Sequence, residues 1–218
     1  MPPQSEVERE KRAAAEAAAQ LVEDGMMVGL GTGSTVAFLL PPLADRHLSI
    51  RCVATSPATE SAARELGLPV EPFNGLDRLD IAIDGADQVA RDGWLVKGGG
   101  GAHVREKIVA AAAQRFVVIV DSGKLVEQLA APVPLELSGF GLRATLRALG
   151  DTELRDAPPS PDGGVLADYG GSVGAPGELA ARLAGTPGVV GHGLFPPEMV
   201  SDVLVGRGTD ARALELTA

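Results

Sequence analysis

The sequence predicts an α/β protein with a doubly wound, mostly parallel sheet (Rossmann-like) and a smaller ferredoxin-like α+β insertion. Two observations support this. Short apolar runs alternate with helical segments over the first 130 residues, the pattern of parallel strands joined by right-handed crossovers. Beyond that point the expected order becomes β-α-β-β-α-β, which is typical of a split ferredoxin-like unit. The 218 residues therefore divide into a larger domain of residues 1–130 and 200–218 and a smaller one of residues 131–199.

The larger domain is expected to begin with a helix. Ser5 and Glu8 have the spacing of a capping box, and the Ala-rich stretch that follows favours a helix to about Val22. Pro57 suits the first turn of a helix that ends near Gly67, and residues 102–114 form the next helix. Continuous apolar runs predict strands that are covered on both faces, at residues 26–30, 50–54, 79–83 and 116–120.

The smaller domain is expected to contain strands at residues 133–137, 152–155, 165–167 and 188–193, with helices at 142–149 and 176–183. A dense cluster of turn residues at 158–164 separates its two central strands. Residues 203–205 are then expected to return to the first sheet.

Composition excludes several classes of protein. A net charge of −10 argues against binding a phosphate backbone, and 3% aromatic residues argue against stacking on single-stranded nucleic acid. The single Cys52 lies in an apolar run and is interpreted as a buried structural thiol. Neither a signal peptide nor a membrane-spanning run is evident, so we expect a soluble, cytoplasmic protein without a membrane partner.

Polar loops follow five of the predicted strands. They contain glycine, hydroxyl and charged residues, at positions 31–35, 55–59, 84–87, 97–101 and 121–124. Ligands of open parallel sheets bind at the carboxyl ends of the strands. Five such loops at equivalent positions therefore predict one binding site.

The loop from Gly29 to Ser34 is rich in glycine, yet it matches no nucleotide motif. A dinucleotide fingerprint would need Gly where Ser34 stands, and the Gly-Lys-Ser/Thr end of a phosphate-binding P-loop is missing. A strand-to-helix turn with backbone amides at a helix N-terminus favours an anion, most simply a phosphate monoester. The alternative is a tight turn with Ser34 as the N-cap.

Two further motifs carry charged groups. Asp84 and Asp87 could bind sugar hydroxyls, hold a metal or belong to a solvated turn; we favour hydroxyls, since two Asp without His are few ligands for a hard cation. Lys97 precedes four glycines, where a cation could neutralise a phosphate or an enolate oxygen. Glu106 is a candidate general base, the alternative being a solvated helix face. The three histidines have no ligand spacing, and surface or capping roles are expected for His47, His103 and His192.

Taken together and in order, these motifs resemble ribose-5-phosphate isomerase of the A type, and the match extends to residues 121–124 and 187–195. The resemblance implies conversion of ribose 5-phosphate to ribulose 5-phosphate in the pentose phosphate pathway, without metal or organic cofactor. It implies that Glu106 moves a proton between C1 and C2, that Asp84 and Lys97 assist ring opening and stabilise an enediolate, and that Asp87 holds hydroxyls. The implied substrate-binding residues are Thr32, Gly33, Ser34, Thr35, Asp84, Gly85, Ala86, Asp87, Lys97, Gly98, Gly99, Gly100 and Lys124.

The family resemblance also implies that the protein forms a homodimer or a tetramer. The small molecule that it binds is expected to be a sugar phosphate. Several positions depart from the family pattern. Gln88 replaces a usual Glu, Gly123 a usual Ser, and His103 an aliphatic residue, and residues 137–140 lack the usual Val-x-Pro pattern. Rival interpretations are a phosphosugar-sensing module, a CoA transferase-like enzyme with a nucleophilic Glu, and an amino-sugar phosphate deaminase. A sensor would usually carry a DNA-binding helical motif, and residues 1–25 are too short for one. A transferase would need a larger chain or a partner subunit. A deaminase would need a His for ring opening, and no obvious candidate is present.

Overall fold

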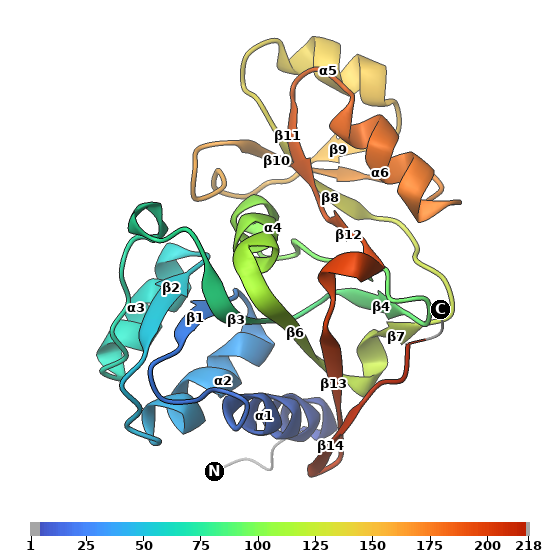
Figure 1. Cartoon of the computed structure of the whole chain (residues 1–218). Coiled ribbons are helices and arrows are strands. Elements are labelled where there is room, and N and C mark those ends of the chain that lie inside the picture. Colours follow the sequence, from blue (N-terminus) through green and yellow to red (C-terminus); the bar gives the residue numbers. More distant parts are fainter. Residues whose placement is uncertain (1–4, 217–218) are drawn as a thin grey trace.

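A six-stranded sheet lies at the centre of the larger part of the molecule in the computed structural model, which describes residues 5–216 (Figure 1). The strands lie in the spatial order β14 (Asp210–Ala213), β13 (Asp202–Arg207), β6 (Ala113–Asp121), β3 (Leu79–Asp84), β1 (Met27–Leu30) and β2 (Arg51–Ala54). All neighbours are parallel except β13 and β14. The predicted doubly wound sheet is therefore confirmed, including the return of the chain to it near residue 203.

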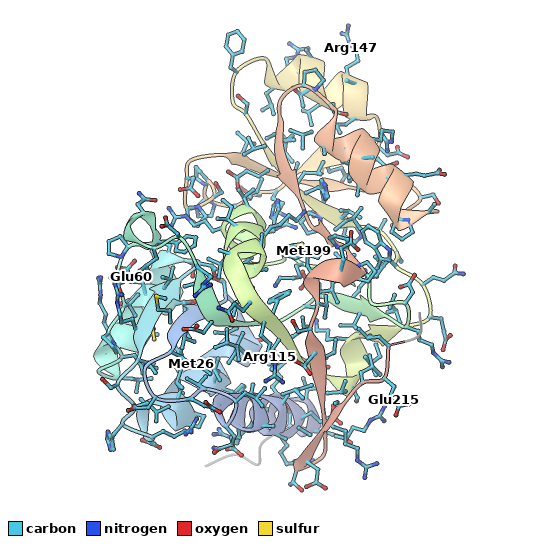
Figure 2. All side chains as sticks on the ribbon, viewed as in Figure 1. Met26, Glu60, Arg115, Arg147, Met199 and Glu215 are labelled. Atoms are coloured by element: carbon cyan, nitrogen blue, oxygen red, sulfur yellow. The ribbon has the colours of Figure 1, made fainter. Side chains whose placement is uncertain are left out.

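Helices cover both faces of this sheet. Residues of α1 (Glu6–Ala19), α2 (Ser34–Ala44) and α3 (Pro57–Glu65) pack on one face against a core that includes Leu30, Ile83 and Ile119. On the opposite face α4 (His103–Ala112) packs against alternate residues of the same strands. Side chains fill the space between these layers (Figure 2). The apolar strand residues point to both faces, and this burial explains why the strands appear in the sequence as continuous apolar runs.

The predicted cap residues define the starts of two helices. Ser5 Oγ accepts a hydrogen bond from the Glu8 amide at 3.2 Å, while the Glu8 carboxylate accepts from the Ser5 amide at 3.1 Å. This reciprocal capping box begins α1. Ser56 caps α3 through the Thr59 amide, with Pro57 in the first turn.

A second, antiparallel sheet is formed by residues 133–192. Its strands lie in the order β11 (Val189–His192), β8 (Val133–Leu137), β10 (Val165–Tyr169) and β9 (Thr152–Leu154). With α5 (Leu142–Leu149) and α6 (Pro176–Ala184) the chain order is β-α-β-β-α-β, as predicted. We call residues 133–192 the antiparallel unit. In Figure 1 it lies beyond α4, on the side of the molecule away from α1.

A third sheet was not predicted. It consists of β12 (Leu194–Phe195), β5 (Leu95–Val96), β4 (Gln88–Ala90) and β7 (Leu125–Val126). The chain also forms three short helices outside this sheet, η1 (Phe73–Gly75), η2 (Ser122–Lys124) and η3 (Pro197–Met199). The loop at 97–101 follows β5 of this small sheet. The prediction that all five polar loops follow strands of one parallel sheet is therefore wrong for this loop, because strands of two residues leave no periodicity in the sequence.

Cys52 lies on β2 in the core and is fully buried, as expected for a structural thiol. Burial raises its pKa to about 12, so the thiol stays protonated and unreactive at neutral pH. Within the part of the chain that the structure describes, no helix combines the length and apolar character needed to cross a membrane.

Candidate active site

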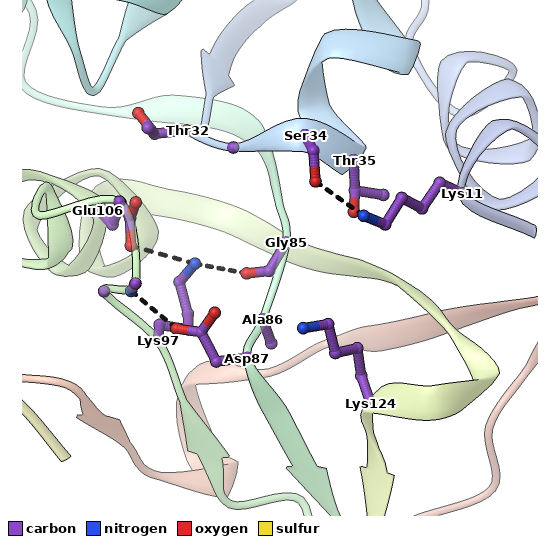
Figure 3. A pocket seen from close by; sticks show the side chains of 14 residues that line it. Lys11, Thr32, Ser34, Thr35, Gly85, Ala86, Asp87, Lys97, Glu106 and Lys124 are labelled. Carbon is purple, nitrogen blue, oxygen red and sulfur yellow. Dashed lines mark hydrogen bonds and ion pairs between the residues drawn. The ribbon is translucent and has the colours of Figure 1, made fainter. Parts of the chain in front are cut away.

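A cavity of about 300 Å³ opens where the polar loops meet (Figure 3). Loops as far apart in the sequence as those of Thr32 and Lys124 contribute to its wall. The lining residues are Lys11, Thr32, Gly33, Ser34, Thr35, Gly85, Ala86, Asp87, Lys97, Gly98, Gly99, Gly100, Glu106 and Lys124. This wall contains every catalytic and substrate-binding residue implied by the family resemblance except Asp84. It also contains Lys11, which the sequence interpretation missed.

The first loop presents the N-terminus of α2 to the cavity. Gly33 adopts a φ of 127°, a left-handed conformation that favours glycine, and it occupies the N-cap position without a side-chain cap. Ser34 is the first residue of the helix, so the alternative in which Ser34 is the N-cap is wrong. Its hydroxyl instead accepts a hydrogen bond of 2.8 Å from Lys11 Nζ. The helix start thus offers backbone amides, a hydroxyl and an ammonium group to an anion.

The loop at residues 55–59 holds the Thr32 loop in place through hydrogen bonds. Thr55 Oγ1 lies 2.8 Å from Thr32 Oγ1, and Thr59 Oγ1 donates to the Gly31 carbonyl at 2.9 Å. Thr55 and Thr59 are buried and do not line the cavity. The prediction that all five loops contact ligand is therefore wrong for this one, which fixes the shape of the Thr32 loop.

Asp84 lies beneath the cavity and not in its wall. Its Oδ1 accepts from the Thr32 amide at 3.1 Å and from the Gly85 amide at 2.7 Å, while its Oδ2 is 2.8 Å from Lys97 Nζ. A Cβ on Gly31 would lie 1.9 Å from Asp84 Oδ1, so the residue at position 31 must be glycine. With both oxygens engaged, Asp84 anchors Lys97 and the Thr32 loop, and its predicted contact with substrate stays a prediction.

Lys97 is the centre of a buried ionic cluster. The side chain is 2% exposed, and Nζ lies 2.8 Å from Asp84 Oδ2. Nζ also lies 2.5 Å from the Gly85 carbonyl and 3.2 Å from Glu106 Oε2 (Figure 3). Burial lowers the pKa of Lys97, but the two carboxylates outweigh burial and raise it above its ordinary value. Lys97 therefore stays charged at the wall of the cavity.

Glu106 is 3% exposed, so the interpretation of a solvated helix face is wrong. It lies in the first turn of α4, and its Oε2 has an ion pair with Lys97 but no well-directed hydrogen bond. Burial, followed by the negative charge of Asp84, raises its pKa to about 8 against the opposing effect of Lys97. A carboxylate that titrates close to neutral pH and faces a cavity has the properties of a general base.

Asp87 and the glycine loop form a further part of the wall, next to Lys97. Asp87 Oδ2 accepts from the Gly99 amide at 2.8 Å. A Cβ on Gly99 would lie 2.8 Å from Asp87 Oδ1, and one on Gly100 would lie 3.3 Å from Thr32 Cγ2, so both loops approach closely only because side chains are absent. Asp87 is half-buried, and it remains available to ligand hydroxyls.

Lys11 completes the cation set with Lys124 of η2. Lys11 lies on α1, and its side chain lines the cavity and donates to Ser34, which is 23 residues away in the sequence. Three basic residues stand close together at Arg9, Lys11 and Arg12, and no local motif distinguishes one of them. Only the packing of α1 beside α2 decides which one reaches the site.

The histidines and Gln88 do not line the cavity. No cluster of three or more His, Cys, Asp or Glu side chains suited to a metal occurs among residues 5–216. His47 is exposed and His192 half-buried, whereas His103 is fully buried, so a surface role for His103 is wrong. Burial lowers the pKa of His103 to about 4, which keeps the ring neutral.

Gln88, one of the departures from the family pattern, does not hydrogen-bond to Asp84 or Asp87. Its side-chain amide donates to the Ala130 carbonyl and accepts from the Ala130 amide, both at 2.8 Å.

Comparison with known proteins gives a consistent result. Residues 51–210 match the family model described as ribose 5-phosphate isomerase A (phosphoriboisomerase A). Ribose-5-phosphate isomerase A of Gluconobacter oxydans (strain 621H) is 44% identical over 212 residues, which cover 89% of this chain and 91% of the relative. The corresponding protein of Thermomicrobium roseum is 44% identical over 224 residues, covering 95% and 94%.

Solved structures agree along the whole chain. Ribose 5-phosphate isomerase A from Neisseria gonorrhoeae superposes with a TM-score of 0.93 at 31% identity, covering 99% of this chain and 100% of that one. A D-ribose-5-phosphate isomerase in complex with phospho-erythronic acid gives 0.90 at 33% identity, covering 97% and 100%. A translation initiation factor eIF-2B from Pyrococcus horikoshii OT3, at 18% identity and 0.55, shares the fold alone.

Proposed function

The chain belongs to the ribose 5-phosphate isomerase A family, and from this premise we propose how its cavity carries out the reaction. The protein is an aldose–ketose isomerase that interconverts D-ribose 5-phosphate and D-ribulose 5-phosphate, a reaction of the pentose phosphate pathway. The observation that carries the proposed mechanism is the position of Glu106: a buried carboxylate with a raised pKa in the wall of the cavity, 3.2 Å from a buried ammonium group.

Glu106 acts as the general base. Its carboxylate removes the proton from C2 of the open-chain aldose, and the electron pair moves toward C1 and its oxygen to form an enediolate. The same carboxyl group returns the proton to C1, and a proton moves between the two oxygens, which completes the ketose without net loss of atoms. A positioned base of this kind contributes about 10²–10⁴-fold to the rate.

Lys97 supplies the positive charge that the enediolate requires. Its ammonium group is already desolvated and held by Asp84 and the Gly85 carbonyl, so no solvent has to reorganise when negative charge develops nearby. Asp84 acts through Lys97 and the Thr32 loop, and it is therefore a positioning residue in this proposal. Asp87, with one oxygen on the Gly99 amide, binds substrate hydroxyls and assists ring opening.

The phosphate binds at the N-terminus of α2. Lys11, Ser34, Thr35 and Lys124 all line this end of the cavity, and the uncapped helix start adds backbone amides. A related isomerase has been solved with phospho-erythronic acid, a ligand that combines a phosphate with hydroxyl and carboxylate oxygens. The proposed arrangement provides partners for each of these groups.

The reaction is tested with purified protein and ribose 5-phosphate. We expect formation of ribulose 5-phosphate in the presence of EDTA, because the proposed steps use only side chains of the chain. In D₂O the enediolate path places solvent deuterium on C1 of the ketose. A folded protein without turnover would contradict the proposed activity, and transfer without any solvent deuterium would indicate a direct hydride shift.

The pH dependence follows from the pKa of Glu106. The base works only when ionised, and with a pKa of about 8 it is roughly one-tenth ionised at pH 7. We therefore expect kcat/KM to rise about tenfold per pH unit below pH 8 and to level off above it. The second ionisation of the substrate phosphate, near pH 6, adds a separate limb at lower pH. A profile that is flat between pH 6.5 and 8.5 would contradict this assignment.

Replacement of Lys11 tests the phosphate site. In Lys11→Gln the side chain can still reach Ser34, but the charge is lost. We expect KM for ribose 5-phosphate to rise by about 10- to 150-fold, the equivalent of the roughly 1.5–3 kcal/mol of a hydrogen bond to a charged group, while kcat changes little. Turnover of unphosphorylated ribose serves as the internal control, since it should not respond to the change. An equal loss on both sugars would place Lys11 outside the phosphate site.

Three further proposals concern the oligomeric state, the localisation and the domain division. We propose a homodimer, for which the outward-facing Phe140, 93% exposed, offers an apolar contact, and light scattering of the purified protein measures the mass. We place the enzyme in the cytoplasm, since a doubly charged sugar phosphate does not cross a bilayer unaided. We propose residues 1–130 with 200–218 and residues 131–199 as two domains, although their outer ends lie outside the described residues; limited proteolysis near residues 130 and 200 tests the division.

A further inference from the structure

The glycine loop of the cavity contacts the antiparallel unit through Leu166, which packs against Gly101, and through Arg155, which reaches the Gly98–Gly99 segment. Arg155 follows β9, and its Nη1 donates to the Gly98 carbonyl at 2.8 Å and lies 3.4 Å from the Gly99 carbonyl. Arg155 does not line the cavity, so its side chain reaches the outer side of the loop. The contact spans 57 residues of sequence to Gly98.

The guanidinium is held in its orientation by a second residue of the unit. Arg155 Nε donates to Asp168 Oδ2 at 2.8 Å and Nη2 to Asp168 Oδ1 at 2.6 Å, the geometry of a two-pronged arginine–carboxylate pair. The side chains are only 17% and 28% exposed. Asp168 lies in the middle of β10, where it is paired with β8 and β9. The donor to the loop is therefore fixed by a sheet.

The Gly98–Gly99 segment has no side chain of its own to hold it in place. Residues 98–101 are all glycine, with no side chain to pack and with a high entropic cost of ordering. Gly98 has a φ of 106°, the Gly99 amide donates to Asp87, and the Gly101 amide donates to the Gly98 carbonyl. The Gly98 carbonyl thus takes part both in the turn and in the contact with Arg155. Asp168, Arg155, the loop and Asp87 form one continuous series of contacts from β10 to the cavity.

We propose that Arg155 is a positioning residue that orders the Gly98–Gly99 segment before substrate arrives, with Asp168 as its orienting partner. This inference rests on the proposed function of the cavity, whose wall the segment forms. Lys97 and Glu106 are held separately by their buried ion pairs, so loss of Arg155 leaves the reacting groups in place. Only the fraction of molecules with an ordered loop binds substrate productively, and the apparent affinity falls by that fraction.

The expected result for Arg155→Gln is therefore a rise in KM of about 10-fold with kcat within about threefold of the wild type, because the loop contributes equally to ground-state and transition-state binding. Arg155→Lys keeps the charge but cannot contact Asp168 with two prongs and the loop together, so it should recover only part of the loss. Asp168→Asn should show a smaller rise in KM of the same kind.

Hydrogen exchange in the absence of substrate gives a readout that does not depend on activity. The amides of Gly99 and Gly101 should exchange about 10-fold faster in Arg155→Gln than in the wild type. Arg51→Gln is the matched control. Arg51 also forms a two-pronged pair with a carboxylate, that of Glu71 at 2.5 and 2.9 Å, but on the far strand β2 and without contact to the glycine loop. It should leave KM and the exchange of these two amides unchanged.

The outcomes separate the two proposals. If the wild type lacks turnover, the proposed function fails, while the exchange experiment still decides whether Arg155 orders the loop. If Arg155→Gln exchanges like the wild type, or lowers kcat at constant KM, the positioning role is wrong. If Arg51→Gln has the same effects as Arg155→Gln, the effects are those of general destabilisation and the inference is also wrong.

Discussion

Replacing Glu106 by Gln is expected to lower kcat by about 10²–10⁴-fold while substrate binding is retained. Gln has nearly the same volume and keeps an oxygen that can accept from Lys97 Nζ, so the 3.2 Å contact survives in neutral form. What is lost is the ability to take up a proton. The two effects separate in steady-state kinetics and in calorimetric titration with a non-reacting sugar-acid phosphate, whose Kd should change by less than about fivefold.

Stability distinguishes a catalytic effect from misfolding in this variant. Glu106 is buried, and burial and Asp84 raise its pKa above that of the unfolded chain, so its ionised form is destabilising in the folded state. The penalty is absent below the unfolded value of about 4.5 and grows as pH rises toward the folded value of about 8. Removing the charge should therefore leave the free energy of unfolding nearly unchanged at pH 4 and raise it at pH 8.

Two further substitutions complete this experiment. Glu106→Asp keeps the base but withdraws it by about one methylene, and misplacement on this scale costs on the order of 10²-fold, so its rate should lie between those of the wild type and Gln. Glu16→Gln, on the exposed side of α1, is the control and should change neither rate nor binding. A Glu106→Gln enzyme that keeps more than about one-tenth of the wild-type rate would remove Glu106 as the base.

Most of the site could be predicted because its residues occur in short local motifs. The Thr32, Asp84 and Asp121 loops each follow a strand with a clear apolar run, and the carboxyl ends of parallel strands meet at one edge. The order of loops along the chain was thus sufficient to place Ser34, Asp87 and Lys124 around one cavity. Sequence reasoning failed where contacts depend on side-chain geometry over long separations.

Asp84 and Lys11 illustrate that failure. Both carboxylates of the Asp84 motif look equivalent in sequence, yet only Asp84 lies beneath the loop, because the chain leaves the sheet at Gly85 and turns Asp87 outward. Lys11 was one of several basic residues on an exposed helix. The third sheet was missed for a different reason: its strands of two or three residues are stabilised by pairing with distant segments, such as β12 with β5, rather than by their own pattern.

Removal of the Lys97 charge is expected to have the second large effect, on both folding and catalysis. In Lys97→Met the carboxylates of Asp84 and Glu106 lose the cation between them while they remain buried. Breaking a buried ion pair on one side costs about 3–5 kcal/mol. We expect the free energy of unfolding to fall by about that amount at pH 8, as measured by urea denaturation, and kcat to fall by about 10²–10³-fold.

The pH dependence identifies the origin of the loss. Lys97 lowers the pKa of Glu106, so its removal should move the acidic limb of kcat/KM to higher pH than in the wild type. At low pH both carboxylates take up protons, and the stability difference between Lys97→Met and the wild type should shrink. A constant difference between pH 5 and pH 8 would mean that Lys97 contributes through packing on Phe195, whose ring centre is 5.4 Å from Nζ, and not through charge.

A second substitution separates folding from catalysis. Adding Asp84→Asn to Lys97→Met removes one uncompensated buried charge and keeps an oxygen for the Thr32 and Gly85 amides. The double variant should therefore be more stable than Lys97→Met alone, while kcat stays low because the cation is still missing from the cavity wall. Since Asp84 and Lys97 are in direct contact, their effects on stability cannot be additive, and additivity within about 0.5 kcal/mol would contradict the ionic cluster as the source of stability. Recovery of kcat together with stability would show instead that Lys97 serves only to hold the fold, and that the enediolate is stabilised by another group.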